Sequence, residues 1–93
     1  MNIKKLKIAR KKIDQLDKKI FTLIEKRTII VNYMMNLKQF KKQIVDKKRI
    51  NQILKNIKKK SLINKVDPKI TTKIWKAIIW AYIDYQRKNF KNK

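Results

Sequence analysis

A long apolar seam in the N-terminal part of the chain limits what the protein can fold into. From Leu6 to Leu37 the seam positions return at alternating steps of three and four residues, with neither Gly nor Pro between them. The positions are Leu6, Ala9, Ile13, Leu16, Ile20, Leu23, Arg27, Ile30, Met34 and Leu37. Such a repeat is typical of a coiled coil, and it predicts one helix from about Ile3 to about Gln39. At ~1.5 Å per residue that helix is about 55 Å long, which is too long for a domain of this size to bury. We therefore expect a second copy of the chain to cover the seam, with an extended monomeric hairpin as the alternative.

Two shorter amphipathic segments follow the long helix. Asp46 is placed to cap a helix over residues 46–60. The apolar positions of this helix are Ile50, Ile53, Leu54 and Ile57. Asp67 and Pro68 form a strong helix start, which predicts a third helix over residues 67–89. Its expected apolar stripe is Ile70, Ile74, Ala77, Ile78, Ala81 and Tyr85.

The connections between these segments are short. We expect loops over Lys41–Val45 and Ser61–Val66. The pattern thus predicts an all-α fold with one domain over residues 1–93. Its three helices follow in the order long, short, long, and we expect two copies of the chain to pair through the long helix as a helical homodimer.

The composition excludes several classes of site. The chain contains no Cys, His or Gly, which removes disulfides, thiol or serine–histidine nucleophiles, the usual zinc or haem ligands and glycine-rich phosphate loops. We therefore expect no metal and no cofactor. Met1–Lys12 is charged throughout and lacks the apolar core of a signal peptide. The longest uncharged run, Thr28–Leu37, is too short to span a bilayer, so a cytoplasmic location without membrane contact is expected.

The formal net charge of +22 permits a second interpretation. Such a charge is compatible with a basic helical module that binds nucleic acid or an acidic membrane surface, with strongly salt-dependent binding. However, the lysines are spread along every segment, and Ile and Asn are abundant too. AT-rich codons favour all three residue types, so a nucleotide-composition bias explains the charge without a polyanionic partner. We expect no nucleic-acid partner.

Arginine is scarce in this lysine-rich chain. Of the 28 basic residues only four are arginines, at positions 10, 27, 49 and 87. Arg27 occupies a seam position where Ile or Leu is expected, and Lys38 lies eleven residues later on the same face. Either side chain can reach water along its aliphatic stem, but a buried guanidinium needs an acidic or ligand partner. Lysine cannot replace the planar fork that binds a carboxylate through two hydrogen bonds, which favours an anionic ligand.

Five sequence features in order resemble the all-helical type of chorismate mutase, a family that includes the isochorismate-pyruvate lyases. The first is Ala9–Ile20, with its Arg10, Ile13, Asp14, Leu16 and Asp17, and the resemblance covers about Leu6 to Lys88. The others are Leu23-Ile24-Glu25-Lys26-Arg27, Lys38, Val45-Asp46-Lys47-Lys48-Arg49 and Gln86. The resemblance implies an intertwined all-helical homodimer that rearranges chorismate to prephenate for aromatic amino-acid biosynthesis. Chorismate carries two carboxylates, and its unimolecular rearrangement needs neither nucleophile nor cofactor.

The resemblance also implies a role for each site residue. Arg27 and Arg10 would bind the carboxylates, Lys38 and Gln86 would donate to the ether oxygen, Asp46 would bind the ring hydroxyl, and Arg49 would help to position a carboxylate. Arg10 and Arg27 lie 17 residues apart on one predicted helix, or about 25 Å. One small dianion cannot reach both in one chain, so if both serve one pocket, Arg10 comes from the partner chain.

Two positions depart from the commonest mutase pattern. Ile50 stands where many mutases have a Glu, and Tyr82 stands where a Ser is often found. Both are compatible with ordinary variation of the pocket wall. They are also compatible with the lyase branch, which cleaves isochorismate to salicylate and pyruvate, although Asp46 favours the mutase. A non-catalytic regulatory member of the family remains an alternative. We expect Trp75 and Trp80 at the core and rim, and Arg87 as a surface charge.

Overall fold

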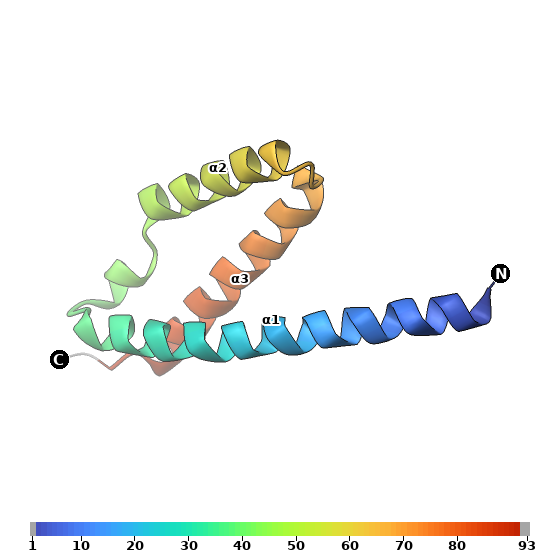
Figure 1. Ribbon diagram of the computed structural model, residues 1–93. Coiled ribbons are helices and arrows are strands. Elements are labelled where there is room, and N and C mark those ends of the chain that lie inside the picture. The colour runs from blue at the N-terminus through green and yellow to red at the C-terminus, as the bar shows by residue number, and fades with distance from the viewer. Residues whose placement is uncertain (1, 92–93) are drawn as a thin grey trace. The chain divides into compact units, whose positions relative to one another are not determined.

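The computed structural model describes residues 2–91, and this part of the chain folds into helices without a strand. The elements are α1 (Ile3–Leu37), a 3-10 helix η1 (Lys41–Ile44), α2 (Lys47–Ile63) and α3 (Pro68–Asn89) (Figure 1). The all-α prediction with helices in the order long, short, long is therefore confirmed. The chain divides into two compact units, Met1–Tyr33 and Met34–Lys93, which we describe separately.

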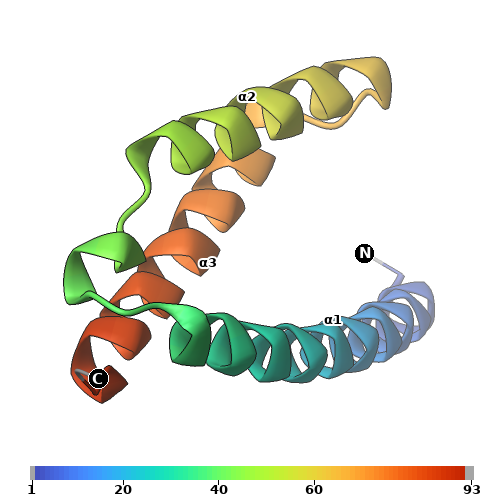
Figure 2. The same cartoon turned by 90° about the vertical axis from the view of Figure 1, so that its left-hand side faces the viewer.

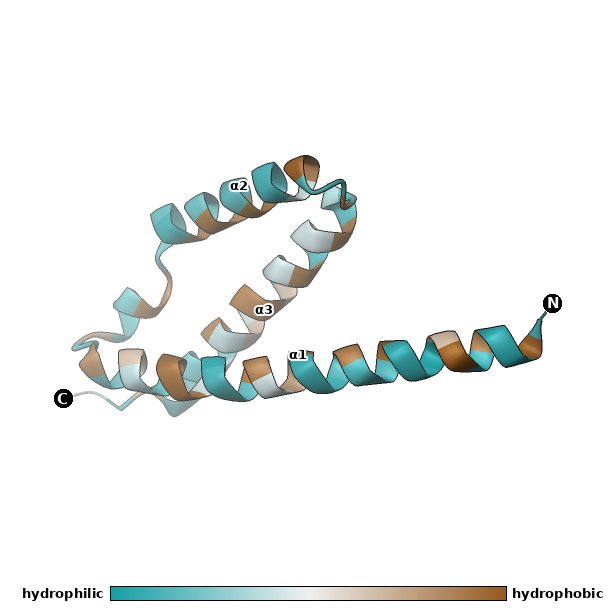
Figure 3. Cartoon of the chain, in the orientation of Figure 1, coloured by the Kyte–Doolittle hydropathy of each residue, from teal (hydrophilic) through white to brown (hydrophobic). Residues whose placement is uncertain are grey.

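The first unit consists of most of α1. Asn2 caps this helix, because its Oδ1 accepts a hydrogen bond from the backbone N–H of Lys5 at 3.0 Å. The predicted seam is present on the helix but is largely uncovered within the chain, and Figure 3 shows its hydrophobic positions recurring between hydrophilic ones. Exposed fractions of 52–62% are found at Ile13, Leu16, Ile20, Leu23 and Ile30.

The second unit is organised around the hairpin of α2 and α3, which are joined by the short turn between Ile63 and Pro68 (Figure 2). Its core consists of the buried side chains Ile44, Ile79 and Ile83. Packed against this core are Val45, Ile50, Ile53, Leu54 and Phe90. Three of the four predicted stripe positions of the second helix, Ile50, Ile53 and Leu54, thus lie against the core, and the fourth, Ile57, is half-buried.

The segment expected as the first loop is partly helical. Residues Lys41–Ile44 form η1, which brings Ile44 into the core with Ile79 and Ile83. The loop prediction over Lys41–Val45 is therefore wrong. A single 3-10 turn is too short to produce a periodic sequence pattern, and here it is stabilised by the burial of one apolar side chain.

The predicted start of the second loop, at Ser61, is also wrong. Helix α2 continues to Ile63, and Ser61 is buried inside it, where its Oγ donates to the Ile57 carbonyl at 2.6 Å and lies 2.7 Å from Thr71 Oγ1. The helix ends in a Schellman motif, in which the N–H of Val66 donates to the Ser61 carbonyl at 2.9 Å. Lys65 supplies the left-handed residue of this motif, with φ 58°. Because the chain has no Gly, no residue marked this stop in advance.

Helix α3 starts as predicted, with Asp67 Oδ1 accepting from the Lys69 N–H at 2.9 Å and Pro68 in the first turn. The predicted apolar stripe is wrong for the single chain. Ile70 and Ile74 are 56% and 48% exposed, whereas the helix buries Ile79, Ile83 and Gln86. The helix has apolar residues on two faces, and packing against α2 and η1 selects the one that is not the predicted stripe.

Candidate active site

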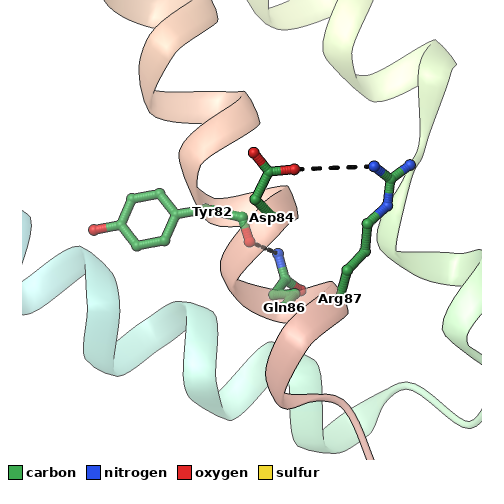
Figure 4. Close-up of polar contacts among 4 residues, drawn as sticks. All are labelled: Tyr82, Asp84, Gln86 and Arg87. Atoms are coloured by element: carbon green, nitrogen blue, oxygen red, sulfur yellow. Dashed lines mark hydrogen bonds and ion pairs between the residues drawn. The ribbon is translucent and has the colours of Figure 1, made fainter.

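A lysine and a glutamine that are distant in the sequence meet in the second unit. Lys38, directly after α1, donates from Nζ to Oε1 of Gln86 near the end of α3, at 3.0 Å. Gln86 is only 7% exposed, and its Nε2 donates to the backbone carbonyl of Tyr82 at 3.2 Å (Figure 4). The ammonium can only donate and the carbonyl can only accept, so the two partners together determine which way the Gln86 amide points.

Two opposing effects act on the pKa of the Lys38 ammonium. Partial burial lowers the pKa of its ammonium from the ordinary value of 10.5, because desolvation disfavours the charged form. The carboxylate of Asp46 acts in the other direction and raises this pKa by stabilising the cation. Three residues that the sequence nominated, Lys38, Gln86 and Asp46, are thus coupled within one unit.

Asp46 has a structural task as well. Its Oδ1 accepts a hydrogen bond from the backbone N–H of Arg49 at 3.0 Å, and its carbonyl accepts from the N–H of Ile50 at 3.0 Å. Asp46 is therefore the N-cap of α2, as predicted. The cap places Arg49 in the first turn of α2, with its side chain exposed.

Arg10 and Arg27 both belong to the first unit, so the second unit alone brings Lys38, Gln86 and Asp46 together. Arg10 is exposed and Arg27 is half-buried on α1. Their separation of 17 residues on one continuous helix corresponds to about 25 Å. A single small dianion cannot bridge both arginines of one chain.

The two departures from the mutase pattern have different surroundings. Ile50 packs against the Ile44–Ile79–Ile83 core, which accounts for an apolar residue at this position. Tyr82 is half-buried, and Figure 4 shows its ring extending to the side of α3 opposite Arg87. Its backbone carbonyl, rather than its hydroxyl, is the group that holds the amide of Gln86.

The remaining nominated residues lie near the surface. Arg87 forms an ion pair with Asp84 at 4.0 Å, and the two side chains are 49% and 75% exposed, which agrees with the expected surface charge (Figure 4). An exposed ion pair such as that of Arg87 and Asp84 contributes little to stability. Trp75 is half-buried, and Trp80 is exposed on α3.

Sequence reasoning missed Gln43. Its side-chain oxygen accepts hydrogen bonds from the backbone N–H groups of Gln39 at 2.9 Å and Phe40 at 2.8 Å. A Gln three residues after an N-cap Ser or Thr is a known capping signal, but Phe40 occupies the N-cap position here, so the sequence contains only half of that signal.

The donor set gives no indication of a metal. The chain has no His or Cys, and residues 2–91 contain no group of three or more acidic side chains that could hold an ion. Over the same residues, none of the helices combines the length and the apolar character needed to cross a membrane. The chemistry available at Lys38, Gln86 and Asp46 is hydrogen bonding and charge stabilisation.

Comparison with known proteins identifies the family. A family sequence profile described as chorismate mutase type II matches residues 9–87, which is most of the chain. Searches of curated proteins and of solved structures returned no match. The matched range contains all the residues that carry the sequence resemblance, from Arg10 to Gln86. The chain therefore belongs to the type II chorismate mutase family.

Proposed function

We propose that this protein is a chorismate mutase, which rearranges chorismate to prephenate in aromatic amino-acid biosynthesis without a cofactor. The observation that carries the proposal is the hydrogen bond between Lys38 and Gln86 in a chain whose residues 9–87 match the family. Two hydrogen-bond donors thereby lie side by side in a partly dehydrated position. An ether oxygen that gains negative charge in the transition state is the acceptor such donors stabilise.

Lys38 and Gln86 each have N–H groups for a ligand in addition to those that they use within the chain. An ammonium has three N–H groups and a primary amide has two. Lys38 uses one for Gln86, and Gln86 uses one for the Tyr82 carbonyl. Lys38 can therefore donate to the ether oxygen with another N–H, and Gln86 can donate with its second one. Because the bonds within the chain orient both groups beforehand, little reorganisation is needed when charge develops.

The other nominated residues bind the substrate in this proposal. Arg27 and Arg49 contact or position the carboxylates, and Asp46 accepts a hydrogen bond from the ring hydroxyl. Bidentate guanidinium–carboxylate contacts hold the substrate in the compact conformer from which the rearrangement proceeds. The reaction is unimolecular, so conformational restriction and charge stabilisation are sufficient and no nucleophile is required.

We further propose that the protein acts as an intertwined homodimer in which Arg10 of one chain serves the pocket of the other. Two observations support this arrangement. The apolar seam of α1 is more than half exposed at Leu16, Ile20 and Leu23, and a continuous apolar surface of that kind is normally covered in a stable protein. The separation of Arg10 and Arg27 along α1 requires two chains if both contact one dianion.

An isochorismate-pyruvate lyase is the second candidate. It is favoured by Ile50, whose side chain packs against the core and leaves no carboxylate at that position, and by Tyr82 in place of a Ser. Asp46 favours the mutase, because its carboxylate is retained at the start of α2 near Lys38.

The two candidates are separated by incubating the purified protein with chorismate and, separately, with isochorismate. Prephenate from chorismate would establish the mutase. Salicylate with pyruvate from isochorismate would establish the lyase instead. If neither substrate is turned over while circular dichroism shows the expected helix content, the enzyme proposal is wrong. Lys38→Met is the matched inactive control, since it removes the central donor and keeps a side chain of similar length.

A further inference from the structure

The side chain of Gln43 makes two hydrogen bonds to the backbone of the segment that links α1 to α2. Helix α1 ends at Leu37, and the chain must then turn before Asp46 caps α2. Gln43 accepts two backbone hydrogen bonds through a single oxygen, from Gln39 at 2.9 Å and from Phe40 at 2.8 Å. Its own backbone N–H donates to the Phe40 carbonyl at 3.0 Å. These three bonds close residues 39–43 into a compact ring.

Along the chain, this ring connects Lys38 to the first core residue, Ile44. On one side, the first amide that Gln43 holds belongs to Gln39, the residue after Lys38. On the other side, the next residue, Ile44, is buried against Ile79 and Ile83. The backbone at Lys38 is therefore connected through Gln43 to an anchored point of the second unit. Ile79 and Ile83 lie on α3, the helix that carries Gln86.

Besides the burial of Ile44, few contacts hold the turn. The backbone N–H of Lys38 donates to the Met35 carbonyl at 3.2 Å, which only continues the end of α1. The ammonium of Lys42 lies 5.7 Å from the centre of the Phe40 ring, a contact that is weak at an exposed site. Gln43 itself is exposed, so its loss leaves no cavity in the core.

We propose that Gln43 is a positioning residue for Lys38: by bonding the backbone amides of Gln39 and Phe40, it sets where the Lys38 ammonium meets Gln86. This inference goes beyond the proposed function by adding a residue that does not touch the substrate, and its kinetic consequence rests on the mutase proposal. Catalytic donors must be held to within a fraction of an ångström, and loosening the backbone beside Lys38 removes that restriction.

The test compares Gln43→Met with Gln43→Glu. Methionine has nearly the same length but is a poor acceptor, whereas a carboxylate accepts both amide hydrogen bonds. We expect Gln43→Met to lower kcat for chorismate by about tenfold with KM changed less than about twofold, because Lys38 acts mainly on the transition state. Gln43→Glu should retain kcat within about twofold. The matched control is Gln52→Met, which makes the same change at an exposed position of α2 and should leave both constants unchanged.

Two further readouts do not depend on turnover. In Gln43→Met, amide hydrogen exchange at Gln39 and Phe40 should accelerate about tenfold, which corresponds to the loss of one hydrogen bond. The pKa of Lys38, followed by NMR of its side chain, should rise towards 10.5 as the ammonium becomes better hydrated. A purely local structural role would accelerate exchange but leave the Lys38 pKa and kcat at their wild-type values.

The outcomes are separable. Wild-type kcat in Gln43→Met, or an unchanged Lys38 pKa, would overturn the positioning role. Equal losses in Gln43→Met and Gln43→Glu would also overturn it, because the acceptor would then not be the relevant group. Absence of chorismate turnover in the wild-type protein would overturn the proposed function alone, and the exchange and pKa measurements would still decide the role of Gln43.

Discussion

Lys65, the left-handed residue in the turn after α2, allows a quantitative test of what its backbone conformation costs. Lys65 has φ 58°, and it holds this conformation so that the N–H of Val66 can bond to the Ser61 carbonyl at 2.9 Å. Glycine is the usual residue at this position of a Schellman motif, because a Cβ atom is unfavourable there. We predict that Lys65→Gly stabilises the protein.

The expected gain is a difference between two effects. Relieving the left-handed conformation of a residue with a Cβ is worth roughly 1–2 kcal/mol. Glycine also gives the unfolded chain more conformational freedom, which costs roughly 0.5–1 kcal/mol. The free energy of unfolding should therefore rise by about 0.7 kcal/mol, which raises Tm by about 3–5 °C for a domain of this size.

Two control variants separate backbone from charge. Lys65→Ala removes the same charge but keeps Cβ, so it should leave Tm near the wild-type value. Lys59→Gly makes the same substitution in the exposed interior of α2, where it should lower the free energy of unfolding by about 0.5–1 kcal/mol.

Thermal unfolding followed by circular dichroism at 222 nm, at equal chain and salt concentrations, measures all three variants. Equal gains for Lys65→Gly and Lys65→Ala would show that charge removal is responsible. A Tm at or below wild type for Lys65→Gly would refute the reasoning about the left-handed residue.

Three further predictions concern the dimer, the titration of the site and the core. The Arg10→Ala and Arg27→Ala variants should each be inactive alone, and mixing the two chains should restore part of the activity, because one pocket of the mixed dimer is intact. Activity that stays at the level of the separate variants would exclude a shared pocket. In the pH profile of kcat/KM, the midpoint of the alkaline limb should lie below pH 10.5, because burial lowers the pKa of Lys38. Asp46→Asn should move this midpoint to a still lower pH, because it removes the carboxylate that raises the pKa of Lys38. The pKa of Lys38 is lower in the folded than in the unfolded chain, so the unfolded state binds the proton more tightly. The free energy of unfolding should therefore increase as pH rises from the folded-state pKa of Lys38 towards 10.5. Ile83→Ala should lower the free energy of unfolding by about 2–5 kcal/mol in urea titrations, and a loss below about 1 kcal/mol would show that this core is not well packed.

The candidate site was predictable to the extent that it consists of residue types in a fixed order. Lys38, Asp46 and Gln86 follow from their spacing within a recognisable motif, and two of them bond to each other in the structure. Gln43 could not be assigned a role in the same way. Its contribution consists of two bonds to backbone amides, and the direction of those amides depends on how α1 ends and η1 begins.

Local signals in the sequence determined the three α-helices and the starts of α2 and α3, but not η1 or the end of α2. A continuous seam without Gly or Pro dictates one long helix, and the Asp67–Pro68 start dictates where α3 begins, because capping and backbone restriction act over a few neighbouring residues. Tertiary structure decided which face of α3 is buried, since the helix has apolar residues on two sides and only packing against Ile44 selects the one with Ile79 and Ile83. It also decided that the long side chain of Lys38 reaches Gln86, because a contact between residues 48 positions apart depends on the whole path of the chain between them.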